Sequence, residues 1–263
     1  MIEFPAAELV LGSDQPADRA QPPHEVAVDA FSLADRCVSA ADFLAFLQAG
    51  PDQLAHTLID CIDPCFIVHR ATGFELRPGC GDFPMIQLGF WGAASYCNWL
   101  SRLDGRVEVY DLVDRSMQPA ADGYRLPTEA EWECACRTGR SAELLDVNSA
   151  DAGPNCRALR ANASSAGNFQ PDLPGPVPVA GLPADAAGLY QMLGNVREWC
   201  QDRFGPYPAS RQHNPGGPTR GAFRVVRGGS FLDDRQSIGP AVRLAAFEDT
   251  RCEVYGFRVA RSQ

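Results

Sequence analysis

The segment from Ser230 to Arg243 carries the side chains best suited to chemistry in this chain. Two adjacent carboxylates, Asp233 and Asp234, precede Arg235. A carboxyl group can act as a general acid or base when burial shifts its pKa, but the same residues also form ordinary surface ion pairs, which are common and individually weak. The sequence leaves both interpretations open and predicts a surface groove formed by Ser230, Asp233, Asp234, Arg235 and Arg243.

Ten cysteines form the second group of candidates. Cys61 and Cys65 are close in sequence and Cys80 follows, with His69 between them. These four side chains could hold zinc, although the usual zinc signature contains two close cysteine pairs and this segment has one. We favour the alternative that the cysteines are free thiols, because free cysteine behaves as a small buried hydrophobe in a reducing compartment.

The composition excludes several classes of partner. The 263 residues have a formal net charge of -10, and no run of Lys or Arg is concentrated enough for nucleic-acid binding. The chain shows no basic and apolar leader and no run of about 18 apolar residues that could cross a bilayer. We therefore expect a soluble cytoplasmic protein, folded as one domain over residues 1–263, with no nucleic acid and no membrane among its partners.

Three helices are predicted to support the candidate side chains. The stretch Ser39–Leu47 begins with a capping serine and repeats apolar residues at helical spacing. A second helix is expected from about Trp91 to Leu103. The third has Thr128 and Glu131 at capping-box spacing and should end near Gly139.

The chain after Gly139 is expected to consist of loops and short strands. It is rich in Gly, Pro, Asn, Asp and Ser, and the short apolar segments Arg224–Arg227 and Gly256–Val259 are typical of strands. Irregular segments of this length are unusual unless they are functional or held by ligands. Metal ions are one way to hold them.

Five segments along the chain resemble motifs of one family. They are Glu8–Ser13, Pro23–Phe31, Arg125–Glu133, Gly188–Trp199, and Arg227–Phe231 with Gly256–Ala260. Together they are similar to the sulfatase-modifying-factor, or formylglycine-generating-enzyme, family. The resemblance covers essentially the whole chain. It implies a C-type-lectin-like α+β fold with two to three helices, short twisted antiparallel sheets and much irregular structure.

Most of the matching residues have a structural interpretation. Trp132 and Trp199 offer large apolar areas and one N–H each, as suits anchors between loops and a sheet. Arg258, inside an apolar segment, is expected to form a bidentate ion pair with Glu129, Glu131 or Glu198.

Calcium is the cofactor that the resemblance implies. In the family, the segment matching Gly188–Trp199 binds this ion through a side-chain amide, two backbone carbonyls and a carboxylate, which by match are Gln191, Gly194, Val196 and Glu198. Such mixed oxygen ligands suit a hard cation. The family more often has Asn or Asp at the position of Gln191, whose extra methylene moves the oxygen. Asn162 is a weaker candidate for a second calcium site.

Copper is not expected. In formylglycine-generating enzymes, two cysteines that follow the Gly-Gly-Ser motif bind copper as thiolates, and Asp233 and Ile238 match their positions here. A carboxylate is a poor ligand for soft copper(I), and isoleucine binds no metal. The family's disulfide partner of the position matching Cys136 falls at Val259, so that bridge cannot form. The resemblance is therefore to members without the cysteine pair, such as those of siderophore maturation.

Three functions remain open for such a member. We expect a bacterial protein that binds a peptide, a peptide-like metabolite or a partner protein in the groove near Asp233; if it is an enzyme, it is an oxidoreductase-like maturation factor. The alternative is a non-catalytic lectin-like binding or accessory module, because the fold alone does not decide function. A variable binding protein of a retroelement ranks lower, because residues 231–255 contain no Asn and only Tyr255 among the tyrosines. The related sulfoxide synthases need an iron site of three histidines, and the four histidines here are scattered.

Overall fold

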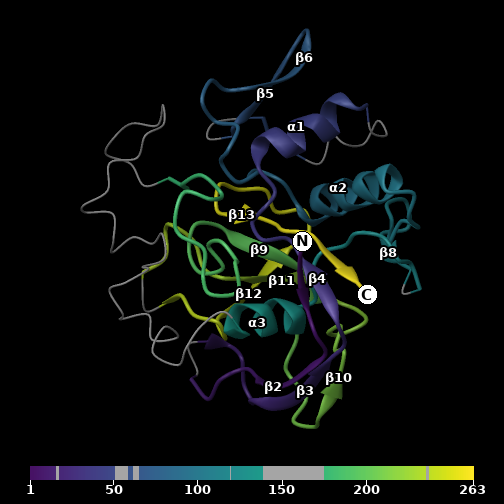
Figure 1. Cartoon of the computed structure of the whole chain (residues 1–263), viewed down its shortest axis with the longest axis vertical. Coiled ribbons are helices and arrows are strands. Elements are labelled where there is room, and N and C mark those ends of the chain that lie inside the picture. Colours follow the sequence, from purple (N-terminus) through teal and green to yellow (C-terminus); the bar gives the residue numbers. More distant parts are fainter. Residues whose placement is uncertain (16–17, 51–58, 62–64, 119, 139–174, 235–236) are drawn as a thin grey trace.

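A four-stranded sheet lies at the centre of the computed structural model of this chain (Figure 1). The structure describes residues 1–15, 18–50, 59–61, 65–118, 120–138, 175–234 and 237–263. The sheet has the order β12 (Arg243–Phe247), β11 (Phe223–Arg227), β9 (Arg197–Arg203) and β13 (Tyr255–Gly256). β11 is antiparallel to both of its neighbours, whereas β13 runs parallel to β9.

Both faces of this sheet are buried. Successive side chains of a strand point to opposite faces, and so Trp199 and Val226 belong to one apolar cluster while Cys200 and Val225 belong to another. The first cluster lies toward α1 (Ala40–Gln48) and α2 (Phe90–Leu103), and the second lies toward α3 (Glu129–Thr138). In Figure 1 the sheet accordingly lies between α1 and α2 on one side and α3 on the other.

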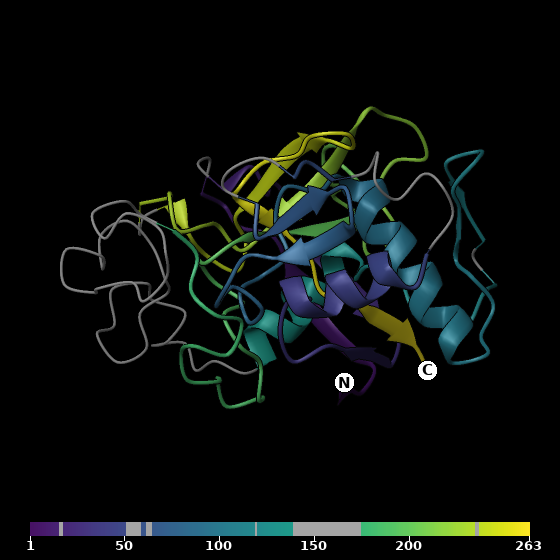
Figure 2. The ribbon, with the colours of Figure 1, turned by 90° about the horizontal axis from the view of Figure 1, so that it is seen from above.

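The helices begin and end close to where the sequence predicts. Ser39 caps α1, where it forms a capping box with Asp42, and α2 starts one residue before the expected Trp91. α1 contacts α2 and the hairpin of β5 (Ile67–Arg70) and β6 (Gly73–Leu76), an arrangement visible in Figure 2.

The capping box predicted for α3 is confirmed. The Glu131 amide donates to Thr128 Oγ1 at 3.2 Å, and the Thr128 amide donates to Glu131 Oε2 at 2.8 Å. Arg125 adds a bidentate ion pair to the same carboxylate, with both distances at 2.6 Å. Glu131 therefore satisfies backbone donors at the helix start and neutralises a buried arginine.

Two three-stranded sheets complete the lower half of the molecule in Figure 1. β2 (Ala7–Leu11), β3 (His24–Val28) and β10 (Gln212–His213) lie beside α3. The other sheet has β4 (Phe31–Leu33) in the middle, with β1 (Ile2–Phe4) and β14 (Ala260–Ser262) antiparallel to it on either side. The remaining strands, β7 (Tyr110–Asp111) and β8 (Ser116–Met117), form a small hairpin after α2.

One predicted strand is corrected by the structure. The segment Gly256–Val259 is a strand only at Gly256, because residues 257–259 form an irregular connection between β13 and β14. The carbonyls of Phe257 and Val259 accept from the amides of Val38 and Ala34. Arg224–Arg227 lies within β11 as expected. None of the described helices is long and apolar enough to cross a membrane.

Candidate functional site

The Gly-Gly-Ser motif forms a tight turn in front of Asp233. Gly228 and Gly229 have φ of +93° and +73°, a region that glycine adopts without strain. A Cβ at Gly229 would also lie 2.5 Å from Cγ1 of Ile238. Beyond the glycines, Asp233 Oδ2 accepts from the amide of Ser230 at 2.7 Å and from its hydroxyl at 2.8 Å. The motif thus holds the Asp233 carboxylate in one place.

Arg197 pairs with this carboxylate from the neighbouring strand β9. Its Nη2 lies 2.5 Å from Asp233 Oδ1, and both side chains are partly exposed, at 16% and 17%. The guanidinium also lies over the ring of Tyr255, 6.0 Å from the centroid. Burial raises the pKa of the nearby Cys252 thiol, while Arg197 lowers it to a smaller degree. We call these four residues, Arg197, Asp233, Cys252 and Tyr255, the Asp233 surface.

The Asp233 surface does not fit copper. The carboxylate at the position of the first family cysteine is already paired with Arg197, and Ile238, at the position of the second, is buried against Gly229. Cys252 is the one thiol among the four residues of this surface, and a single thiolate does not make the two-thiolate copper site of the family. Asp234 is exposed beside this surface, and Arg235 lies outside the described residues.

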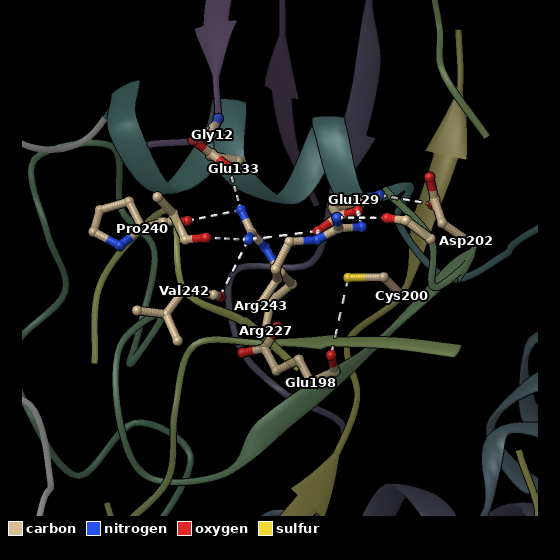
Figure 3. Close-up of polar contacts among 12 residues, drawn as sticks. Gly12, Glu129, Glu133, Glu198, Cys200, Asp202, Arg227, Pro240, Val242 and Arg243 are labelled. Atoms are coloured by element: carbon tan, nitrogen blue, oxygen red, sulfur yellow. Dashed lines mark hydrogen bonds and ion pairs between the residues drawn. The ribbon is translucent and has the colours of Figure 1, made fainter. Parts of the chain in front are cut away.

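Arg243 and Ser230 do not belong to the predicted surface groove, because both side chains are buried. Only 2% of the Arg243 side chain is exposed, and its Nε and Nη2 donate to the two oxygens of Glu129 at 2.8 and 2.7 Å (Figure 3). Its Nη1 donates to the Gly205 carbonyl at 2.8 Å. A short sequence segment therefore contributes Asp233 to the surface and Arg243 to the interior.

A second buried pair lies next to this one (Figure 3). Arg227 Nη2 donates to Glu133, and the same guanidinium donates to the carbonyls of Pro240, Ala241 and Val242. Both charged side chains are fully buried. Buried charges are tolerated when they are paired and hydrogen bonded, and this network fixes the chain between Asp233 and Arg243 against α3.

Asp202 is a buried acid that sequence reasoning missed. It follows Trp199 in β9 with no motif to mark it, and only the folded chain places it beside Glu129 at the start of α3 (Figure 3). Its Oδ2 accepts from the Glu129 amide at 2.8 Å. Burial, and after it the Glu129 charge, raises the pKa of Asp202 to about 8. The side chain therefore carries a proton at neutral pH.

The carboxylate of Glu198, a predicted calcium ligand, is engaged by protein donors. Arg258 binds it in a bidentate manner at 2.7 Å on each oxygen, which identifies the partner of Arg258 among the three expected acids. Trp132 Nε1 donates to Oε2 at 2.8 Å, and the Cys37 thiol donates to Oε1 at 3.3 Å. Trp132 and Trp199 are fully buried, as expected of anchors.

The calcium set does not fit the ion in this arrangement. Gln191 Oε1 accepts from the side-chain Nδ2 of Asn195, and Gln191 Nε2 donates to the Pro178 carbonyl at 2.9 Å. With Glu198 also engaged, an ion would have to displace both partners before Gly194 and Val196 could add their carbonyls. Calcium stays a prediction of the resemblance, and Asn162 lies outside the described residues.

The zinc alternative gains no support from the described part of the chain, where no three His, Cys, Asp or Glu side chains are grouped to hold a metal ion. The thiols of Cys61 and Cys65 interact, whereas His69 stacks on Phe74. Every described cysteine is a free thiol. The expectation of free cysteines is thus met within the residues that the structure describes.

The architecture and the site together define a C-type-lectin-like protein with an aspartate and an isoleucine at the copper position. The family model described as sulfatase-modifying factor enzyme 1-like domain matches residues 1–263. The chain therefore belongs to the sulfatase-modifying-factor, or formylglycine-generating-enzyme, family.

The chain covers a small part of some relatives and nearly all of others. The chain is 28% identical over 268 residues to serine/threonine-protein kinase pkn1 of Chlamydia caviae, with 99% of this chain and 38% of that protein aligned. It is 35% identical over 292 residues to formylglycine-generating enzyme of Thermomonospora curvata, covering 99% and 92%. Thus it spans under half of the kinase that it matches.

The same fold occurs in Treponema denticola variable protein 1. The two structures superimpose with a TM-score of 0.73 at 23% identity, covering 100% of this chain and 95% of that one. At this identity the likeness shows the fold and carries no information on the ligand.

Proposed function

We propose that this chain binds a peptide, a peptide-like metabolite or a partner protein at the Asp233 surface and does not convert cysteine to formylglycine. The supporting observation is the Arg197–Asp233 pair, in which Asp233 matches one of the family's two catalytic cysteines and is held by Arg197. Its two side chains present opposite charges that remain partly exposed. Such a pair can orient a polar ligand, and neither side chain supplies the soft donor that copper chemistry requires.

The neighbouring side chains add apolar area to this proposed ligand surface. Leu232 is 39% exposed in the turn between Ser230 and Asp233, and Tyr255 is partly exposed beside Arg197. Binding surfaces typically combine apolar or aromatic anchors with a few polar groups that fix orientation. An amphipathic segment of a peptide or protein meets both requirements.

The test uses a labelled sulfatase-type peptide carrying Cys-x-Pro-x-Arg. In fluorescence anisotropy we expect the chain to bind it, and we expect Arg197→Ala to weaken binding by about tenfold, the loss of one charge-assisted contact. Arg211→Ala is the matched control. Arg211 directly precedes β10, is exposed, and pairs with the exposed Glu8. Equal affinities of the two variants would show that the peptide does not bind at the Asp233 surface.

The catalytic half of the proposal has its own assay. The chain is incubated in air with copper, a reductant and the same peptide, and the peptide mass is followed. We expect no aldehyde. Aldehyde that disappears in Cys252→Ser would show that the oxidase site is rebuilt from a different cysteine, and the proposal would then be wrong.

A further inference from the structure

A cavity of about 280 Å³ lies between α3, β9 and β12, away from the residues of the Asp233 surface. Two loops rich in proline and glycine, Gly205–Pro208 and Pro215–Pro218, form its walls. The polar side chains that line it come from four strands, one loop and one helix: His24, Glu129, Asp202, Tyr207, Gln212 and Arg243. Several of them are buried, so the polar groups were desolvated when the chain folded.

Three of the five N–H donors of the arginine in this cavity already bind protein acceptors. Nε and Nη2 of Arg243 bind Glu129, and Nη1 binds the Gly205 carbonyl. The face of the guanidinium lies 3.9 Å from the ring centroid of Tyr207. A carboxylate or phosphate in the cavity would therefore meet the Glu129 and Asp202 carboxyls, while the Nε–Nη2 edge of Arg243 is already occupied by Glu129.

Acceptors, in contrast, are present. His24 Nδ1 lies 3.2 Å from the Pro22 carbonyl, and in a neutral ring that donates through Nδ1 the other nitrogen, Nε2, is an acceptor. Asp202 accepts one bond, from the Glu129 amide. A ligand with N–H donors could therefore bond to Asp202 and to His24 in this cavity.

We infer that this cavity is a binding site for a small organic ammonium compound with a compact apolar body. The ammonium group would lie near Asp202, where its charge complements the carboxylate. The body would pack on Tyr207 and on the prolines of the two loops, for example Pro206 and Pro218. Glu129 and Arg243 neutralise one another, so Asp202 is the acid of the cavity left to balance an added cation.

Binding of a cation should release the proton of Asp202. Burial and the Glu129 charge keep that carboxyl protonated at neutral pH, and an ammonium group beside it would reverse this effect. The titratable or charged groups that face Asp202 are Glu129 and Glu131 of α3, Arg243 of β12, Cys200 of β9 and Arg125, and His24 of β3 lines the same cavity. Affinity should therefore rise about tenfold per pH unit up to about pH 8 and then level off.

Three probes of nearly equal size and different charge separate the alternatives: benzylammonium, benzyl alcohol and benzoate. By isothermal titration calorimetry on the full chain near pH 8 we expect benzylammonium to bind one site, at least about tenfold more tightly than the alcohol, and we expect no binding of benzoate. Titration in two buffers of different ionisation enthalpy should report the released proton. Equal binding of amine and alcohol, or no binding of the amine at about 10 mM, would overturn the inference.

The site is assigned by a matched pair of variants. Asp202→Asn keeps an acceptor for the Glu129 amide but cannot become an anion, and we expect it to lose about tenfold in affinity for benzylammonium together with the pH dependence. Asp60→Asn removes a partly exposed carboxylate that pairs with Arg251 elsewhere, and we expect it to bind like the unmodified chain. If Asp202→Asn fails to fold, the pH profile of the unmodified chain decides: an affinity independent of pH below about 8 contradicts the inference.

Discussion

The raised pKa of Asp202 makes a prediction about stability. The folded chain keeps a proton on this carboxyl, with a pKa of about 8, that the unfolded chain releases near 3.8. Stability from this group is therefore complete below pH 3.8, falls as pH rises through this window by at most about 1.4 kcal/mol per unit, and levels off above pH 8. We expect Asp202→Asn to flatten this decline, because a carboxamide has no proton to release.

The measurement is the free energy of unfolding in urea at several pH values between about 5 and 8, for the unmodified chain and for Asp202→Asn. Parallel curves for the two proteins would show that Asp202 titrates in the folded chain as it does in the unfolded one. The raised pKa would then be wrong.

The buried pair of Glu198 and Arg258 should be highly sensitive to removal of one partner. Glu198→Ala leaves the guanidinium fully buried without its carboxylate, so we expect a loss of about 3–5 kcal/mol in the free energy of unfolding. Glu8→Ala is the matched control, because Glu8 pairs with Arg211 while 73% exposed, and we expect a change within about 0.5 kcal/mol. Comparable losses for both variants would contradict the argument from burial.

For single residues, the sequence predicts that a buried arginine has an acidic partner but does not decide which acidic residue this is. A lone Arg258 in an apolar segment indicates a buried ion pair, and three glutamates were suitable by type. Only the fold separates them, since β13 brings its neighbour Arg258 to Glu198 on β9, while Glu131 is occupied by Arg125. Asp202 had no such signal, because its burial depends on α3, which is far away in sequence.

Among the elements, the turn at Gly228 and Gly229 gives the sharpest test. Gly229 and Gly79 have nearly the same φ, +73° and +75°, but a methyl group at Gly79 would meet nothing within 4 Å, whereas at Gly229 it would lie 2.5 Å from Ile238. We expect Gly79→Ala to cost about 1 kcal/mol from backbone conformation alone. Gly229→Ala should cost a further 1–3 kcal/mol, roughly the usual range for overpacking.

Thermal or urea unfolding of the two alanine variants measures this difference directly. A cost for Gly229→Ala no larger than that for Gly79→Ala would mean that Ile238 moves aside without loss. The packing described for the chain between Ser230 and Arg243 would then be looser than the structure indicates.

Elements defined by local signals were predicted well, and elements defined by distant pairing were not. The start of α3 depends on Thr128 and Glu131, three residues apart, and both the cap and the helix end match. The segment after Gly256 has the composition of a strand, yet the carbonyls of Phe257 and Val259 bond to the segment before α1 instead of a neighbouring strand. Arg243 lies in the interior for a similar reason, because its partner Glu129 comes from another element.

Whether calcium stabilises the whole molecule can be tested by unfolding the chain. An ion bound only by the folded state raises stability by mass action. If calcium binds as the family resemblance implies, it should therefore stabilise the fold. The contacts of Glu198 with Arg258 and Trp132 favour the opposite result. We therefore expect the same unfolding midpoint in calcium and in chelator. A higher midpoint in calcium that is absent in Gln191→Ala would show that the ion displaces these contacts.

The overall architecture could be predicted because family motifs are spread along the entire chain. Segments from Glu8 to Ala260 match in order, and the structure has the expected α+β fold with three described helices. The matched positions of the copper ligands were sufficient to argue against oxidase chemistry. The cavity at Asp202 could not be predicted in this way, because its walls combine β3, α3, β9 and β12 with two loops that carry no recognisable motif.

The sheet in which β4 lies between the first and the last strand affects how the molecule responds to tension. β1 and β14 run in the same direction, and Ile2 and Ala260 both pair with Leu33. Ser262 pairs with Phe31, so Ile2 and Ser262 lie at opposite ends of this sheet along the strand direction. A force applied between the two ends acts along the strands, whereas the ladder hydrogen bonds lie across them. All of these bonds would be loaded together in shear instead of opening one after another like a zipper. The domain is thus built as a mechanical clamp, in which forced unfolding must shear a whole strand pair of β4, either with β1 or with β14, before a terminus is released.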